Sequence, residues 1–82
     1  MIRVNRVKPL AGYRLQIEFE DGASGVLDVS GDLYGPVFEP LRDVRLFEQV
    51  STDEFGVICW PNGADLAPEA VYSDVAAASV QS

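Results

Sequence analysis

The chain has 82 residues, enough for one domain, 1–82, with a single core and a marginally stable monomer. Thirteen acidic residues against six basic ones give a formal net charge of −7, which argues against nucleic-acid binding because phosphate groups would be repelled. The chain has no histidine and a single cysteine, Cys59, so it can form neither an internal disulfide nor a thiolate metal cluster.

The first predicted strand covers residues 2–8. Ile2 and Val4 lie on one face of this strand, but Val7 is out of step, which predicts a bend or a β-bulge before Pro9. Four of the six basic residues crowd this end of the chain: Arg3, Arg6, Lys8 and Arg14. They could form a weak patch for an acidic partner, but a solvated strand face is the simpler interpretation.

The expected cellular location of the protein is judged from its first residues and from the length of its apolar runs. Residues 1–5 contain no apolar stretch of signal-peptide length, and no run anywhere approaches the ~18 apolar residues of a membrane span. We therefore expect a cytoplasmic protein with no membrane contact.

Residues 14–20 alternate between polar and apolar side chains and predict a half-buried strand, which a turn joins to a second strand over 23–29. Two registers are conceivable for this hairpin. We predict a three-residue loop with Gly22 in a left-handed conformation, because this register pairs Leu15 with Leu27 and keeps both in the core. The same register predicts Tyr13 opposite Val29 and Arg14 opposite Asp28.

The middle of the chain mixes loops with short elements. A loop is predicted over residues 31–36, and Asp43 can cap a short helix that runs to Gln49. Residues 51–53 and 57–60 are predicted to form a second hairpin. The apolar anchors expected between these elements are Val37, Phe38 and Leu41.

The most specified stretch of the chain runs from Cys59 to Glu69. Its opening Trp-Pro-Asn-Gly predicts a strand end followed by a tight turn, and Pro68 suits the first position of a helix because it has no amide hydrogen to lose there. The same spelling could build a small binding site on the turn, but we favour the architectural interpretation. The candidate binding or structural residues are Trp60, Pro61, Asn62, Gly63, Asp65, Pro68 and Glu69.

The two acids of this stretch invite a chemical interpretation. Paired carboxylates can act as acid and base or hold a hard cation, but Asp65 and Glu69 supply too few ligands for a metal and have no histidine beside them. We therefore predict no catalytic residue, no metal and no cofactor. Capping of the first helical turn is favoured for the pair, and an alternative role for Asp65 is to fix the turn by accepting backbone hydrogen bonds.

Two further features have an ordinary and a functional interpretation. Cys59 lies in an apolar run, so a small buried hydrophobe is favoured over a reactive thiol. Four aromatic residues could form a platform for a ligand, but a shared place in the core is favoured. These residues are Trp60, Tyr34, Phe38 and Tyr72.

Together these patterns predict a small α+β domain, with one antiparallel sheet of four to five strands in two hairpins packed against one or two short helices. The last helix begins at Pro68 and places Val71, Val75 and Ala78 on one face. Its alanine-rich end, residues 76–82, has neither a closing glycine nor a base and is expected to fray.

Three blocks of sequence together resemble a known family. They are residues 15–22, residues 37–41 and the string 60–69, with Phe47 and Tyr72 as further matches. In this order they resemble the bacterial domain-of-unknown-function family 2442, over residues 2 to about 73. The resemblance implies a small α+β domain, similar to the N-terminal domain of a Nitrosomonas protein, with no established activity and no catalytic residues to transfer.

The resemblance also bears on partners. Some members of that family append a helix-turn-helix domain, and short members are often encoded beside another small protein, which implies an antitoxin-like role. This chain ends at Ser82, so a transcription-factor role is in doubt for it alone.

Three functions follow from these patterns. The first is a non-catalytic interaction module, a possible antitoxin-like partner, that binds a nearby-encoded basic protein by its acidic surface or a sheet edge. The alternative is a small-molecule or metal-binding domain that uses the turn from Trp60 to Glu69. The third is a DNA-associated regulator without its helix-turn-helix domain. Marginal stability leaves a homodimer open.

Overall fold

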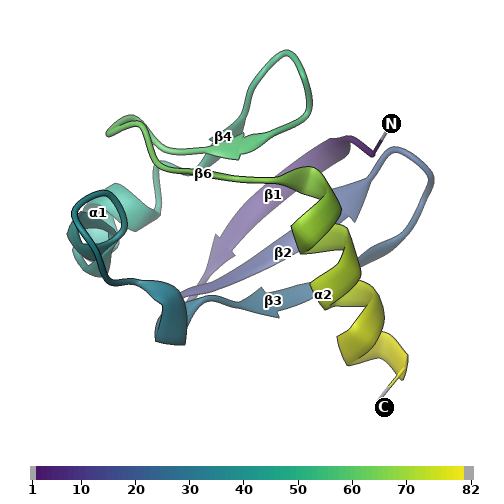
Figure 1. Cartoon of the computed structure of the whole chain (residues 1–82), viewed down its shortest axis with the longest axis horizontal. Coiled ribbons are helices and arrows are strands. Elements are labelled where there is room, and N and C mark those ends of the chain that lie inside the picture. The colour runs from purple at the N-terminus through teal and green to yellow at the C-terminus, as the bar shows by residue number, and fades with distance from the viewer. Residues whose placement is uncertain (1, 81–82) are drawn as a thin grey trace.

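A computed structural model describes residues 2–80 of the chain, with the backbone alone from residue 77 onward. Figure 1 shows its elements, which in chain order are β1 (Val4–Leu10), β2 (Arg14–Phe19), β3 (Ser24–Asp28), the 3-10 helices η1 (Ser30–Asp32) and η2 (Glu39–Arg42), α1 (Val44–Phe47), β4 (Ser51–Thr52), β5 (Ile58–Cys59), β6 (Asp65–Leu66) and α2 (Pro68–Val80). In the described part of the chain, no helix is both long and apolar enough to span a membrane.

The fold is α+β, as predicted, but the expected single sheet of four to five strands is wrong. Within residues 2–80 the strands form two three-stranded antiparallel sheets, β1-β2-β3 and β4-β5-β6. At the start of β1, the Val4 N–H donates to the Gly56 carbonyl at 2.9 Å. The strands of the second sheet have only two residues each, too few to extend the ladder of the first.

The predicted irregularity in the first strand is confirmed as a β-bulge. Val4 pairs with Phe19 and Arg6 with Glu18, so Asn5 is the extra residue. The bulge shifts the alternation by one residue and brings Val7 opposite Ile17 on the inner face. The strand continues past the predicted end at residue 8, because proline is tolerated on an edge strand where no partner needs its N–H.

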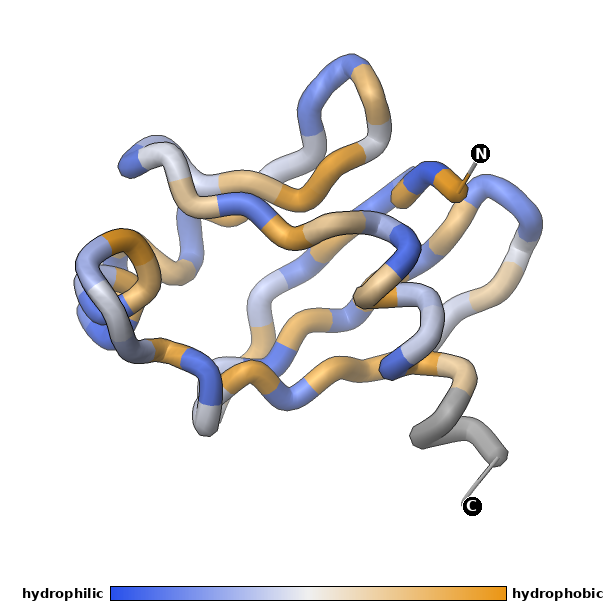
Figure 2. The backbone as a smooth tube through the Cα atoms, viewed as in Figure 1, coloured by the Kyte–Doolittle hydropathy of each residue, from blue (hydrophilic) through white to orange (hydrophobic). Residues whose placement is uncertain are grey.

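The register of the β2–β3 hairpin is the predicted one. Leu15 pairs with Leu27 and Arg14 with Asp28, and Gly22 has a φ of +92°. The Val29 N–H donates to the Tyr13 carbonyl at 3.0 Å, which continues the predicted pairing beyond the strands. In Figure 2, hydrophobic and hydrophilic residues alternate along these strands, and the inward set packs in the core.

Three hairpin loops of the chain share one construction. In each, the first residue accepts a hydrogen bond from a glycine three positions later and donates one to the carbonyl four positions later. The three glycines have positive φ angles, +92° at Gly22, +74° at Gly56 and +94° at Gly63. The loops are 19–23, 53–57 and 60–64. The Trp-Pro-Asn-Gly turn therefore joins two strands, β5 and β6, and β6 was not predicted.

The connecting helices were predicted in part. The Asp43 carboxylate accepts a hydrogen bond from the Arg45 N–H at 3.0 Å and caps α1, as predicted. The helix ends at Phe47, two residues before the predicted Gln49. Of the three expected anchors, Leu41 is buried and Phe38 half-buried, but Val37 is exposed, because it lies in the turn that precedes η2.

Helix α2 covers the inner face of the first sheet, as Figure 1 shows. It begins at Pro68, as predicted, and buries Val71 and Val75. A Cβ atom at Gly25 of β3 would lie 2.5 Å from Val75 Cγ1, so glycine permits this close approach. The backbone is helical to Val80, whereas the side chain of Ala78 and residues 81–82 lie outside the described structure, so the expected fraying of residues 76–82 stays a prediction.

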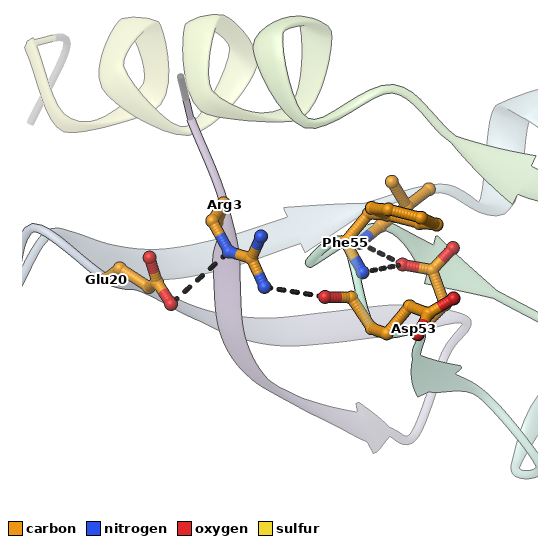
Figure 3. Close-up of polar contacts among 6 residues, drawn as sticks. Arg3, Glu20, Asp53 and Phe55 are labelled. Atoms are coloured by element: carbon orange, nitrogen blue, oxygen red, sulfur yellow. Dashed lines mark hydrogen bonds and ion pairs between the residues drawn. The ribbon is translucent and has the colours of Figure 1, made fainter.

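Arg3 and Gly56 join the two sheets. Figure 3 shows the Arg3 guanidinium between two loops, where it donates to the Glu54 carbonyl at 2.7 Å and lies 3.4 Å from the Glu20 carboxylate. The Asp53 carboxylate closes the neighbouring loop by accepting from the backbone N–H groups of residues 55 and 57. A residue near the N-terminus therefore holds together the tips of two separate hairpins.

Candidate functional site

Trp60 is a core residue and only 4% exposed. Its indole N–H donates to the Phe47 carbonyl at 3.0 Å, and the centroids of the two rings lie 6.0 Å apart. The prediction that all four aromatic residues lie in the core is wrong for Tyr34, which is 64% exposed. Phe38 and Tyr72 are half-buried at the margin of the core. The fold therefore does not bring these four aromatic rings together in one platform.

Asn62 closes the tight turn and ties it to a distant segment. Its Oδ1 accepts from the Ala64 N–H at 3.2 Å, while its Nδ2 donates to the Val37 carbonyl at 2.9 Å. Asp21 has the same two tasks in the first hairpin. One of its oxygens accepts from the Ala23 N–H at 2.9 Å and the other from the Tyr72 hydroxyl at 2.8 Å.

The turn-fixing role considered for Asp65 belongs to Asn62 instead. Asp65 lies opposite Cys59 in the β5–β6 pair, where its side chain is exposed, and Glu69 is exposed in the first turn of α2. Neither carboxylate has a hydrogen bond or ion pair with the other residues that the structure describes. Over residues 2–80, no three acidic or cysteine side chains gather closely enough to hold a metal ion. Cys59 itself is half-buried.

The perturbed pKa values belong to residues that shape turns. The pKa of Asp21 is lowered, first by the hydrogen bond from the Ala23 N–H and then by that from the Tyr72 hydroxyl, and the same contact raises the pKa of Tyr72. The pKa of Asp28 is lowered, first by the side chain of Ser30 and then by its backbone N–H. Since both aspartates are exposed and all three groups are engaged by hydrogen bonds that shape the fold, their shifts describe architecture and not a reactive centre.

The structure adds an apolar pocket of about 160 Å³ that sequence reasoning missed. Leu27 of β3 and Val29 just after it line the pocket together with Ala67, just before α2, and Ala70 in the first turn of that helix. Trp60 is among the apolar residues of the pocket. Two exposed acids, Asp32 and Asp74, also line this β3–α2 pocket. The sequence signal that could have indicated this pocket was the pair of small residues, Ala67 and Ala70, close together where a helix was predicted to begin.

Among residues 2–80, no strand pairs with the outer edge of β3 in the first sheet. The hydrogen bonds from Phe19 N–H to the Ala23 carbonyl and from Val29 N–H to the Tyr13 carbonyl show that odd-numbered residues of this strand bond to β2. The backbone groups of the even-numbered residues therefore point away from β2, since bonding alternates along an antiparallel strand. These residues are Ser24, Val26 and Asp28. We call this row of outward-pointing backbone groups on Ser24, Val26 and Asp28 the β3 edge.

The opposite edge of the sheet is partly closed. The Val4 N–H of β1 is bonded to the Gly56 carbonyl, and Pro9 of the same strand has no N–H to offer. The β3 edge is therefore the better template for another strand, and its central side chain, Val26, is 45% exposed.

Comparison with known families matches residues 4–76 to the family described as "Protein of unknown function (DUF2442)". The chain belongs to this family. The match confirms the resemblance and covers the β3 edge, the β3–α2 pocket and the Trp60–Glu69 stretch of this DUF2442 protein. No curated protein and no solved structure matches the chain, so the similarity to the N-terminal domain of a Nitrosomonas protein stays a prediction.

The two polar residues of the turn should differ in their effect on the stability of this DUF2442 protein. Replacing Asn62 with alanine removes two hydrogen bonds and should lower the free energy of unfolding by about 1–2 kcal/mol. Asp65→Ala should change it by less than about 0.5 kcal/mol, as is usual for exposed residues without such contacts. Urea unfolding of the two variants tests this expectation, and equal losses would contradict the assignment of the turn to Asn62.

Proposed function

We propose that this protein is a non-catalytic protein-interaction module that receives an extended segment of a partner along the β3 edge. The observation that carries the proposal is the row of outward-pointing N–H and C=O groups on Ser24, Val26 and Asp28, while the β1 edge on the opposite side of the sheet is partly closed. Addition of a strand to such an edge is a recurrent mode of peptide recognition, in which main-chain hydrogen bonds provide affinity.

The charge of the chain supports a basic partner. A net charge of −7 attracts a positively charged protein over distance and raises the rate of encounter, most strongly at low salt. An antitoxin-like role in a two-protein system is the finer form of this proposal. It requires that the protein copurify at low salt with the product of the neighbouring gene, and the absence of such a complex would remove that form.

The other two functions have less support. A ligand site on the turn would have only the exposed carboxylates of Asp65 and Glu69 to offer, because both side-chain polar atoms of Asn62 are used within the protein and Trp60 is buried. A DNA-associated role gains nothing from the acidic charge. A second copy of the chain could occupy the β3 edge, and sedimentation of the purified protein would reveal that homodimer.

Proline at position 26 should separate edge pairing from folding. Val26→Pro removes an N–H that β2 does not use, so the sheet keeps its ladder while an added strand loses a hydrogen bond and meets the proline ring. Binding peptides are first selected by the wild-type protein from a displayed library of random nonapeptides. The Val26→Pro variant should bind them at least about tenfold more weakly than the wild type does, a loss of about 1.4 kcal/mol in binding free energy. Binding is measured by fluorescence polarisation.

The control is Val26→Thr, which keeps the N–H and the branched shape and should bind the peptides as the wild type does. Circular dichroism shows whether each variant is folded before binding is compared. Equal binding to the proline variant, or a library that yields no binder, would overturn the proposed edge.

A further inference from the structure

The β3–α2 pocket lies on the inner face of the first sheet. A strand added at the β3 edge would present every second side chain to the same face. Side chains alternate between the two faces of a strand, and Leu27 of β3 points inward and lines the pocket. The inward-facing side chain of a strand paired with β3 would stand about 5 Å from Leu27 on the same face. Strand addition therefore brings a partner side chain to the pocket wall.

We propose that the β3–α2 pocket receives one apolar side chain, of leucine or phenylalanine size, from the strand that pairs with β3. We infer further that Asp32 and Asp74 select a lysine or arginine two residues away in that strand. This inference rests on the proposed function and names the sequence class of the partner.

The size of the pocket favours a single side chain. A cavity of about 150 Å³ lined by aliphatic and aromatic groups holds one benzene ring, and the pocket here measures about 160 Å³. Sites for drug-sized molecules usually measure about 300–1,000 Å³. A leucine or phenylalanine side chain therefore fits the pocket better than a metabolite does.

The position of the acids sets the spacing of the partner's charge. Asp32 and Asp74 line the pocket, so a base that reaches them must project from the same face of the added strand as the apolar side chain. The nearest such positions in a strand are two residues away, on either side. Because both aspartates are exposed, they add modest affinity and mainly decide which partner binds.

Filling the pocket tests the apolar half of this inference. Ala70→Leu places a larger side chain in the pocket and should weaken binding of the selected nonapeptides at least about tenfold. Ala76→Leu makes the same change at an exposed position of the same helix outside the pocket and should leave binding unchanged. Equal binding to the Ala70→Leu variant and the wild type would overturn the assignment of the pocket.

Neutralising one acid tests the charged half. Asp74→Asn should weaken binding about two- to fivefold at low salt and less at 1 M salt, because screening removes the contribution of exposed charges. Asp65→Asn removes the same charge outside the pocket and should have a smaller effect. The selected peptides should carry lysine or arginine two residues from an apolar residue, and a selection without this pattern would overturn the inference.

The two proposals fail in distinguishable ways. If Val26→Pro abolishes binding while Ala70→Leu does not, strand addition stands and the pocket has no part in recognition. If the peptides bind the Val26→Pro variant as tightly as the wild type, the edge itself is wrong. In that case a loss caused by Ala70→Leu would identify a pocket that takes side chains without strand pairing.

Discussion

Replacing Gly56 with alanine should lower the free energy of unfolding by about 3 kcal/mol. The expectation has two parts, because Gly56 has a φ of +74° and is also buried against the start of β1. A left-handed conformation costs a residue with a Cβ atom about 1–2 kcal/mol. The added Cβ would also lie 2.7 Å from Arg3 Cβ and 3.0 Å from the backbone N of Val4, a contact that only backbone movement can relieve.

That movement would strain the joint between the two sheets. The Gly56 carbonyl accepts a hydrogen bond from the Val4 N–H. In the same loop the Glu54 carbonyl accepts a hydrogen bond from the Arg3 guanidinium, which Figure 3 shows. For a domain of this size a loss of about 3 kcal/mol lowers Tm by roughly 12–24 °C. Thermal unfolding followed by circular dichroism measures the change.

Gly22→Ala is the matched control, because Gly22 occupies the same place in another hairpin with a φ of +92° but has no atom within 4 Å of an added Cβ. Its cost should be the conformational part alone, about 1–2 kcal/mol. The difference between the two variants therefore reports the contact with Arg3 and Val4. Equal losses would show that this contact does not contribute to stability.

Replacing Trp60 with alanine should lower the free energy of unfolding by about 3–5 kcal/mol. The buried indole packs beside Phe47, and its loss would leave a large cavity. It would also leave the Phe47 carbonyl without the indole N–H, which adds to the cost inside a core. An 82-residue domain has a total stability of roughly 4–12 kcal/mol, so this variant should lose a large share of its stability.

Tyr34→Ala serves as the control, because Tyr34 is another large aromatic residue but is mostly exposed. It should change the free energy of unfolding by less than about 0.5 kcal/mol. Urea unfolding followed by far-ultraviolet circular dichroism suits both variants, since it does not depend on tryptophan fluorescence. A Trp60→Ala variant as stable as the Tyr34→Ala variant would contradict the place of the indole in the core.

Local patterns predicted much of the first sheet. The alternation over residues 14–20 determined which side chains face inward, and Gly22 after Asp21 determined the loop length, so these two features together fixed the register. The Asp43 cap and the start of α2 at Pro68 were likewise predictable. Each of these depends on interactions between residues that are close along the chain.

Contacts between residues that are far apart along the chain could not be predicted from such local patterns. Strand β6 has only two residues, too few for a periodic signal, and forms because β5 offers it a partner. Asn62 and Asp65 are both good turn residues, and only the position of the Val37 carbonyl decides that Asn62 ties the turn down. The turn-fixing role considered for Asp65 was therefore given to the wrong residue, and a binding role for the stretch from Trp60 to Glu69 stays a prediction.

The sequence by itself determined the family, the α+β class and the three glycine-based loops, because these follow from spacing, alternation and the φ angles that only glycine adopts cheaply. Only the tertiary structure decided that the strands divide into two sheets, that the β3 edge stays open and that α2 leaves a pocket beside it. The physical reason is that an open edge and a pocket are properties of how distant segments pack, and no local pattern records which neighbour a strand or a helix will have.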